Sequence, residues 1–360
     1  MFRLSVTICP NLAVGSLQSA RRLPATGLKG WQMRRWQKVG IAASVLVASV
    51  YLLNASWLAE DPPGRPTLIA QRGVHQVFDP RNVDNNTCTA TRIPPPAHAL
   101  IDNTLPSIAA AFNAGADVVE VDVRQTSDGQ YVLFHDASPD CRTDGHGPVL
   151  THALEELKQI DVGYGYSADG GRSFPLRGKG VGQMPTFEQA LHAFPTRCFL
   201  VQLKDGGPDV GEKVVRYLEA RDLADWLRLS FFGNQTAIRR LSELRPQART
   251  WYERRMVSCA VGYLALGWSG YVPETCSKGV MIVPTNIRTL EWGWPNRFLQ
   301  RMRREDVQVL MIDSLGSTHA VDFMRLDSAD ELHELPVHFD GAIWTDHIER
   351  IGPAARRIWR

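Results

Sequence analysis

The stretch Asp117–Arg124 reads DVVEVDVR, so acidic residues alternate with valines along it. In an extended strand, residues two apart point to the same face, so Glu120 and Asp122 share one face and the valines share the other. Two carboxylates in an apolar setting repel each other unless a cation lies between them, and Mg²⁺ or Ca²⁺ suits oxygen ligands. The stretch therefore predicts a buried strand with a divalent-metal site. Two solvent-facing acids on an edge strand are the alternative.

A second short apolar run, Tyr131–His135, follows the turn Ser127-Asp128-Gly129 and ends in His135-Asp136. A histidine beside a metal-held phosphate can protonate a leaving alkoxide, and a neighbouring carboxylate can orient its ring. We therefore expect His135 to be the general acid–base group of a metal-dependent phosphodiesterase. A lone histidine is more often a packed or surface residue, so this prediction depends on the surrounding motifs.

Short apolar runs alternate with amphipathic stretches along the rest of the chain. The expected strands are Thr67–Arg72, Val118–Val123, Tyr131–His135, Phe199–Leu203, Leu227–Phe231, Gly279–Val283, Val307–Ile312 and Gly341–Trp344. The expected helices are Leu105–Ala114, Gly211–Ala220, Asn234–Leu244, Pro295–Arg304 and His347–Arg357. About eight such units predict a parallel α/β fold, a TIM (β/α)8 barrel. A doubly wound sheet is the alternative, although no G-x-G-x-x-G fingerprint follows the first strand.

The N-terminal region predicts membrane insertion. Residues 39–59 form an apolar run of about the length that spans a bilayer, with basic residues before it and Glu60-Asp61 after it. The positive-inside rule places the body on the periplasmic or extracellular side. A signal peptide cleaved near Ala55 or Ala59, giving a secreted protein, and a twin-arginine export signal at Arg34-Arg35 are alternatives. Residues 1–38 form a basic segment, of which residues 1–32 are either disordered or precede a true start at Met33.

Charge and cysteine content fit an exported domain. The net charge is +2, but seven bases and no acid precede Glu60, which leaves −5 on the remainder. An acidic body argues against nucleic acid as a partner. Export places five of the six cysteines in an oxidising compartment, where Cys88–Cys141 and Cys259–Cys276 are the preferred pairs and Cys198 is a core residue. The sequence does not fix this connectivity, and buried free thiols are the alternative.

Several short motifs surround the acidic strand in a fixed order. They are Gln71-Arg72-Gly73, Asp102-Asn103-Thr104, Ala114–Asp117, Glu120–Val123, Thr126–Gly129, Phe134-His135-Asp136, Arg142–Gly147, Leu154–Ile160, Leu203-Lys204 and Gly341–Asp346. In this order the chain resembles the glycerophosphodiester phosphodiesterase family, phosphodiesterases that have a phosphatidylinositol phospholipase C-like TIM barrel. The resemblance implies a catalytic domain over residues 66–353, with a small insertion at about 142–184, and the same fold as the strand pattern.

The resemblance also implies an activity and a set of roles. Members hydrolyse glycerophosphodiesters to glycerol phosphate and an alcohol with a divalent cation, so Mg²⁺ or Ca²⁺ and a glycerophosphodiester or lysophospholipid-like substrate are expected. The implied metal ligands are Asp102, Glu120, Asp122 and Gln202. Arg72 and Lys204 are implied to hold the phosphate, His135 to transfer protons, and Trp344 to form a wall of the pocket, although barrel packing is an alternative for Trp344.

Two departures from the family pattern bear on catalysis. Gln71 replaces the first family histidine, and Gln202 replaces a glutamate on the third strand. Glutamine exchanges no proton near neutral pH, and its amide oxygen binds a hard cation more weakly than a carboxylate does. We hypothesise that His75 reaches back to supply the missing proton relay; a loop histidine that contacts phosphate is the alternative. A catalytically impaired barrel that binds phosphodiesters and a phospholipase D-like enzyme acting on lipid head groups are the alternative functions.

Overall fold

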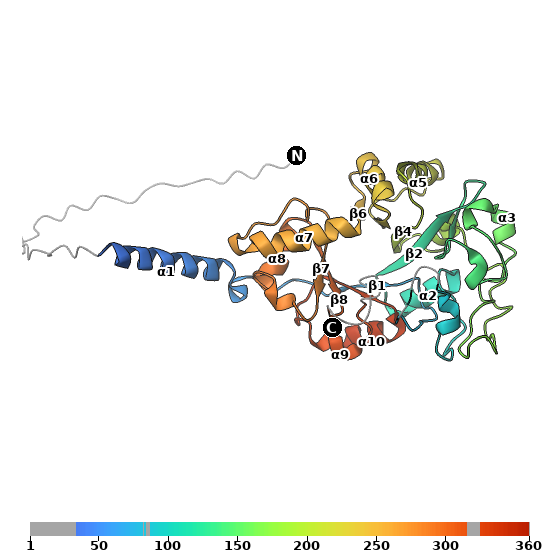
Figure 1. Ribbon diagram of the computed structural model, residues 1–360, viewed down its shortest axis with the longest axis horizontal. Coiled ribbons are helices and arrows are strands. Elements are labelled where there is room, and N and C mark those ends of the chain that lie inside the picture. Colours follow the sequence, from blue (N-terminus) through green and yellow to red (C-terminus); the bar gives the residue numbers. More distant parts are fainter. Residues whose placement is uncertain (1–33, 82, 84–86, 315–324, 360) are drawn as a thin grey trace, which may run out of the picture. The chain divides into compact units, whose positions relative to one another are not determined.

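The computed structural model describes residues 34–81, 83, 87–314 and 325–359. The chain divides into two compact units, Met1–Val47 and Ala48–Arg360. In the first unit, the described residues belong to the helix α1 (Arg35–Leu53), which continues into the second unit. The second unit contains the predicted catalytic domain (Figure 1). The expected state of residues 1–33, and Cys9 among them, lies outside the described residues.

Eight parallel strands form a nearly closed barrel within the described part of the chain. They are β1 (Thr67–Ala70), β2 (Val118–Gln125), β4 (Cys198–Leu203), β5 (Leu229–Gly233), β6 (Arg249–Trp251), β7 (Val280–Pro284), β8 (Gln308–Ile312) and β9 (Ala342–Thr345). Their order is β6-β5-β4-β2-β1-β9-β8-β7, so β1 pairs with both its successor β2 and the last strand β9. Among the described residues no pairing joins β6 to β7, which leaves one seam. The α/β barrel expectation is confirmed at this level.

Helices alternate with the strands. They are α2 (Leu105–Ala114), α3 (Leu154–Leu157), α4 (Phe187–Ala193), α5 (Pro208–Ala220), α6 (Gln235–Leu244), α7 (Glu253–Leu266), α8 (Asn296–Arg304), α9 (Ala329–His333) and α10 (Ile348–Ile358). The 3₁₀ turns are η1 (Ser56–Leu58), η2 (Thr89–Arg92), η3 (Pro139–Cys141), η4 (Val149–Thr151), η5 (Gly267–Ser269) and η6 (Arg288–Leu290). Local sequence sets the ends of α2, because Thr104 accepts from the Ser107 amide at its start and Gly115 adopts φ 111° at its end.

The acidic strand divides two apolar layers. Val119, Val121 and Val123 belong to the large cluster that also contains the apolar residues of the surrounding helices. The barrel interior has a separate cluster, made of Ile69, Leu200, Trp251, Val280, Leu310, Ile312, Ala342 and Trp344. Glu120 and Asp122 are fully buried, as the alternation predicts, and this excludes the edge-strand alternative.

One strand that we predicted for the barrel lies outside it, and one barrel strand was not predicted. The run Tyr131–His135 forms β3 (Tyr131–Leu133), which pairs antiparallel with β2 and stands outside the barrel order. The missing barrel strand is β6, which has only three residues and reads Arg-Thr-Trp. Its length gives no apolar run, so only pairing with β5 identifies it. The helix α7 that follows was also missed.

Both preferred cysteine pairs are bonded. Cys88–Cys141 joins the long loop after β1 to η3 across a sequence separation of 53, and Cys259–Cys276 joins α7 to the segment before β7. Cys198 is free and half-buried. The apolar residues behind the first disulfide form a third cluster that includes Ala90, Phe134 and Tyr166, so the loop and the 142–184 region share one small core.

Helix α1 is long and apolar enough to cross a membrane, with a mean hydropathy of 1.5 over its most apolar window and no buried residue. A signal sequence near an N-terminus has the same character, so the helix fits either a membrane anchor or a signal sequence.

We expect the Cys88–Cys141 disulfide to stabilise the fold. Replacing both residues, Cys88→Ser with Cys141→Ser, should lower the free energy of unfolding by about 2–4 kcal/mol, because the open loop gains conformational freedom when unfolded. Guanidinium denaturation of the detergent-solubilised chain measures this change. The matched control Cys198→Ser, at the free cysteine, should cost less than about 1 kcal/mol. Equal stability of the double variant and the parent would contradict the expectation.

Candidate active site

Four charged side chains meet where β1, β2 and β4 end. The Nε of Arg72 lies 2.9 Å from Oδ2 of Asp122, and the Arg72 amide donates to Oε2 of Glu120 over 3.1 Å. The Nζ of Lys204 lies 3.6 Å from Oδ1 of Asp122. The carboxyl ends of parallel strands meet at one mouth of a barrel, which is where the sequence places these residues. The structure therefore brings together four of the predicted site residues.

The two carboxyl groups differ in their protonation. Burial, and then the negative charge of Asp122, raises the pKa of Glu120. Burial acts in the same direction on Asp122, but Arg72 and other neighbouring positive charges hold its pKa well below the usual range. Because like charges this close cannot both ionise at no cost, the pair takes up one negative charge readily and the second only with an added cation.

A tight turn after β1 places Arg72. Arg72 has φ 51°, and Gly73 has φ 84° and lies against Ser107 so closely that a β-carbon there would fall 2.1 Å from its hydroxyl oxygen. The Ser107 hydroxyl donates to the Arg72 carbonyl over 2.8 Å. Glycine is therefore required next to Arg72, since a side chain would displace α2.

Asn103 was not assigned a role from sequence, and it holds the acidic strand from the side. Its amide nitrogen donates to Oδ2 of Asp122 over 2.9 Å, and its amide oxygen accepts from the Asp122 backbone over 3.0 Å. Asn103 adopts φ 59°, a conformation that asparagine tolerates better than most residues. The sequence feature that could have indicated this role is the position of Asn103 in the Asp102-Asn103-Thr104 motif.

His135 is oriented as the sequence predicts. Its Nδ1 lies 2.6 Å from Oδ1 of Asp136, whose second oxygen accepts from Nε of Arg142 over 2.8 Å. Arg142 and the His135 ring hold the pKa of Asp136 far below its usual range despite burial, so Asp136 is ionised and accepts. The proton of the neutral ring therefore lies on Nδ1, and Nε2 carries the lone pair.

Burial lowers the pKa of His135 to about 4, and the nearby charge of Arg72 acts in the same direction. The ring is consequently neutral at physiological pH. In this form Nε2 accepts a proton, which is the state that a general base requires.

Arg142 connects the loop after β1 to the histidine. It is buried and donates to Thr89 Oγ1 over 2.7 Å and to the Tyr166 hydroxyl over 2.8 Å. Asp102 accepts from the same Tyr166 hydroxyl and lies 3.5 Å from Arg142. Asp102 is thus held by these two residues, and its role as a metal ligand stays a prediction. Sequence analysis gave Arg142 and Tyr166 no function.

Gln71 has a partner that no motif indicated. Its amide oxygen accepts from Nε of Arg325 over 2.7 Å, and the Arg325 guanidinium stacks 3.9 Å from the centroid of the Trp344 ring. Burial lowers the pKa of Arg325. Arg325 lies more than 250 residues from Gln71 and carries no local signal, so only the fold reveals the contact.

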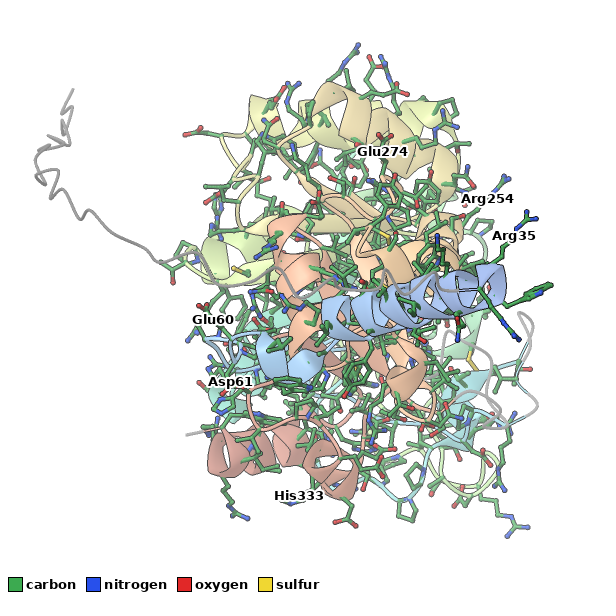
Figure 2. The ribbon with its side chains drawn as sticks, turned by 90° about the vertical axis from the view of Figure 1, so that its left-hand side faces the viewer. Arg35, Glu60, Asp61, Arg254, Glu274 and His333 are labelled. Atoms are coloured by element: carbon green, nitrogen blue, oxygen red, sulfur yellow. A yellow bond between two sulfur atoms is a disulfide. The ribbon has the colours of Figure 1, made fainter. Side chains whose placement is uncertain are left out.

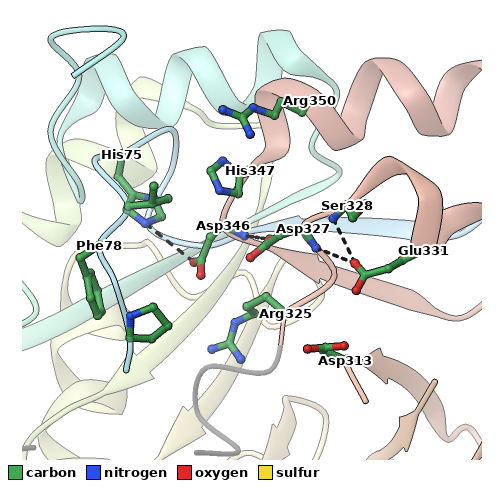
Figure 3. A pocket seen from close by; sticks show the side chains of 12 residues that line it. His75, Phe78, Asp313, Arg325, Asp327, Ser328, Glu331, Asp346, His347 and Arg350 are labelled. Carbon is green, nitrogen blue, oxygen red and sulfur yellow. Dashed lines mark hydrogen bonds and ion pairs between the residues drawn. The ribbon is translucent and has the colours of Figure 1, made fainter. Parts of the chain in front are cut away.

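A polar cavity of about 410 Å³ adjoins this contact. Arg325 lines it together with His75, Phe78, Asp327, Glu331 and Asp346, which Figure 3 shows pointing toward a common space. The Nε2 of His75 lies 3.8 Å from Asp346, and its Nδ1 lies 3.5 Å from the Gly73 carbonyl. Within the described residues His75 makes no hydrogen bond to Gln71, so the proton relay through His75 stays a hypothesis.

Two buried oxygens at the acidic pair have no hydrogen-bond partner, Oε1 of Glu120 and Oδ1 of Asp122. The third expected oxygen, Oε1 of Gln202, accepts from Nζ of Lys204 over 3.2 Å. Among the described residues no three His, Cys, Asp or Glu side chains form a ready metal cluster. The two unpartnered carboxylate oxygens nevertheless fit a hard cation, with the Gln202 amide as a neutral third donor.

Residues 91–226 match the model of the glycerophosphoryl diester phosphodiesterase family. The match covers 136 of the 360 residues, so this part of the chain is similar to the family. The matched segment includes Asp102, Glu120, Asp122, His135 and Lys204, whereas Gln71, Arg72 and Trp344 lie outside it.

Curated relatives match part of the chain. A glycerophosphodiester phosphodiesterase of Caldanaerobacter subterraneus subsp. tengcongensis is 28% identical over 153 residues, which are 41% of this chain and 59% of the relative. One from Bacillus subtilis is 30% identical over 34% of this chain and 42% of its own length. The chain thus spans less than two thirds of the length of these relatives.

The fold extends further than the sequence match. The glycerophosphoryl diester phosphodiesterase domain of a Mycobacterium tuberculosis protein superposes with a TM-score of 0.57 at 19% identity, covering 82% of this chain and all of the domain. An Oleispira antarctica phosphodiesterase in complex with the product sn-glycerol-3-phosphate has a TM-score of 0.52 at 20% identity, covering 81% of this chain and 97% of its own. At these sequence identities, the structural similarity shows a shared fold and nothing further.

We expect Asn103→Ala to lower the free energy of unfolding by about 2–4 kcal/mol, because buried Asp122 loses a donor and its amide loses an acceptor. Urea denaturation measures the change. Asp222→Ala is the matched control, since Asp222 also has a positive φ of 58° but an exposed side chain. It should cost about 1 kcal/mol of backbone strain. Equal losses in the two variants would show that strain alone accounts for the effect.

Proposed function

We propose that this chain hydrolyses glycerophosphodiesters to glycerol phosphate and an alcohol, assisted by a divalent cation. The observation that carries the proposal is the convergence of the Glu120–Asp122 pair, Arg72, Lys204 and the Asp136-oriented His135 at one mouth of the barrel. The match of residues 91–226 to the family model supports the same reaction class. When bound, the cation supplies charge stabilisation at a phosphoryl oxygen.

Arg72 and Lys204 bind the phosphodiester in this proposal. Both are almost fully enclosed and both already lie beside Asp122, so they are held in place before substrate arrives. A phosphodiester carries one negative charge, and more develops on its oxygens as water adds. Preorganised positive groups lower the energy of that state because they need not reorient.

His135 performs both proton transfers. Its Nε2 takes a proton from the attacking water as the new P–O bond forms, and the resulting imidazolium gives a proton to the alkoxide as the other P–O bond breaks. Asp136 keeps Nδ1 protonated throughout, and Arg142 holds Asp136.

Arg325 compensates for part of what Gln71 loses. Gln71 exchanges no proton, but it fixes the Arg325 guanidinium at the edge of the site by accepting from its Nε. Arg325 thereby adds a third positive charge beside Arg72 and Lys204. In this proposal Trp344 forms the floor beneath Arg325, and His75 lines the neighbouring cavity where the alcohol portion lies.

A catalytically impaired barrel that binds phosphodiesters is the second candidate function. Gln71 and Gln202 favour it, because one removes a proton-transfer group and the other removes a charged ligand. The metal ligands in either case are Glu120 and Asp122 with Gln202, and Asp102 is a further candidate behind Tyr166.

We also propose that helix α1 anchors the chain in a membrane and that the barrel lies on the periplasmic or extracellular side. The apolar helix and the preceding basic residues support this orientation. Two disulfides in the barrel support an oxidising compartment. Secretion after cleavage of a signal sequence is the alternative.

Turnover of glycerophosphocholine by the full chain in detergent, with Mg²⁺ or Ca²⁺ and after chelation, tests the activity. We expect chelation to abolish turnover and Asp122→Asn to lower kcat/KM by about 10²-fold or more.

Gln202→Glu should lower the half-saturating cation concentration about tenfold, because a carboxylate replaces an amide. Asp209→Asn, at an exposed acid of α5, is the control and should keep the parental rate. Binding of glycerophosphocholine without turnover would favour the impaired barrel, and neither binding nor turnover would overturn both functions.

The pH profile tests the role of His135. Because the lowered pKa keeps Nε2 unprotonated down to about pH 4, kcat/KM should stay level through pH 6 and fall only near pH 4. An ordinary histidine would lose activity near its usual pKa of about 6.5. His135→Ala should lower the plateau by about 10²–10⁴-fold. An acid limb near pH 6.5, or an unchanged plateau in His135→Ala, would contradict this role.

A further inference from the structure

An exposed apolar surface lies on α7 and the turn after it. Residues 256–273 contain no charged side chain. Large apolar side chains on this stretch are nonetheless 43–60% exposed; they are Val257, Val261, Leu266, Trp268 and Tyr271, and we call them the α7 face. Arg255 and Glu274 bound the stretch, and Figure 2 labels Glu274 and the neighbouring Arg254. Several large apolar side chains exposed on one short stretch often mark a contact with a partner or a membrane.

The other side of α7 is fully used by the barrel. Cys259 and Tyr263 are buried, and the Tyr263 hydroxyl donates to the Trp292 carbonyl over 2.7 Å. The Cys259–Cys276 disulfide fixes the helix against the segment that leads into β7. Val257 and Val261, four residues apart, therefore cannot turn inward to hide from water.

The α7 face is hydrogen-bonded to the end of the apolar helix α1. Buried Arg301 of α8 donates through Nη2 to the Leu53 carbonyl over 2.9 Å and through Nη1 to the Asn54 side chain over 2.9 Å. The same Nη1 lies 3.0 Å from the Gly267 carbonyl of η5. Asn54 in turn donates to the Trp268 carbonyl over 2.8 Å. Asn54, which follows the apolar helix, and Trp268 of the α7 face are thus joined directly.

These contacts argue that the helix is retained. Cleavage near Ala55 or Ala59 would remove Leu53 and Asn54 and leave the buried Arg301 guanidinium without two of its acceptors. Losing partners of a buried charge is costly, so the folded barrel uses the residues that a signal peptidase would discard. The next turn, η1, is also attached, because its Ser56 hydroxyl oxygen accepts from the Asn296 amide over 2.9 Å.

We propose that the α7 face, together with exposed Trp57 and Leu58 of η1, rests on the lipid bilayer in which α1 is anchored. The inference extends the proposed anchoring and does not depend on the catalytic activity. Tryptophan and tyrosine prefer the boundary between lipid and water, and the stretch without charges lets aliphatic side chains enter it. We choose a bilayer as the occupant because Asn54, the residue after the apolar helix, donates a hydrogen bond to the Trp268 carbonyl. The α7 face therefore lies next to the point where the helix would leave the membrane.

The anchor and the mouth of the active site lie at opposite ends of the barrel. In a β/α barrel the helices run opposite to the strands, so the end of α7 and the turn η5 lie at the end of the barrel where the strands begin. Thr67, the first residue of β1, follows the anchor at that same end. Arg72 and Lys204 follow the last residues of β1 and β4, at the opposite end. The mouth therefore lies at the end of the barrel opposite to the anchor, where a water-soluble phosphodiester can reach it.

Photo-crosslinking of the full chain in phosphatidylcholine–phosphatidylglycerol proteoliposomes tests the proposal. A benzophenone amino acid replaces Val261 or Trp268, and mass spectrometry detects lipid adducts after illumination. Leu46, in the apolar helix, is the positive control, and Leu227, which is 91% exposed on the barrel, is the matched negative control. We expect adducts at positions 46, 261 and 268, and at least tenfold fewer at 227.

Any other result of the crosslinking experiment would contradict a specific part of the proposal. Adducts at 46 without adducts at 261 and 268 would overturn docking and leave the anchor intact, and no adduct at 46 would overturn both. Equal labelling at 227 would show that contact is not confined to the α7 face. Release of head groups from the host bilayer as fast as glycerophosphocholine is hydrolysed would overturn the inferred orientation, whereas loss of all turnover with the expected adducts would concern only the proposed function.

Discussion

The burial of two carboxyl groups side by side in the barrel interior is the constraint on which the site depends. Glu120 and Asp122 lie on one face of β2 without exposure to water, and the opposite face of the strand carries the valines that pack beneath the helices. Such a pair is unfavourable unless positive charge and hydrogen-bond donors surround it. Arg72, Lys204 and Asn103 provide them, and each comes from a different segment that reaches the same end of the barrel.

The same constraint bears on the two positions at which the chain departs from the family pattern. Gln71 and Gln202 each replace a family residue with a neutral amide, but each amide oxygen has a cationic partner, Arg325 and Lys204 respectively. The site thus combines three cationic side chains, Arg72, Lys204 and Arg325, with two buried carboxyl groups. This is a site arranged around anion binding, with His135 as the remaining titratable group beside it.

The two ends of the barrel have different tasks. The end where strands finish collects the charged residues and the disulfide-linked loop, and Arg142 connects that loop to His135 through Asp136. The end where strands begin holds the last residues of α1 through Arg301. Because the strands separate these ends, a contact with lipid at one leaves the other open to solvent.

Local sequence was sufficient to predict those elements whose burial is indicated by hydrophobic periodicity or by a motif. The alternation in Asp117–Arg124 identified the strand, its two faces and the paired carboxylates, and the bounds of α2 follow from its cap residues. Sequence also identified His135 with its orienting Asp136, and both disulfide pairs. These features depend on neighbours within a few residues, or on cysteines, whose choices of partner are few.

Tertiary structure decided what depends on pairing between distant segments. β6 is too short to show an apolar run, so its pairing with β5 alone makes it a barrel strand, and β3 has the composition of a barrel strand but pairs antiparallel outside it. Arg325 reaches Gln71, and Arg301 reaches Leu53, across some 250 residues of chain. A single charged residue carries no periodicity, so its partner is fixed only when the closing barrel brings the two segments together.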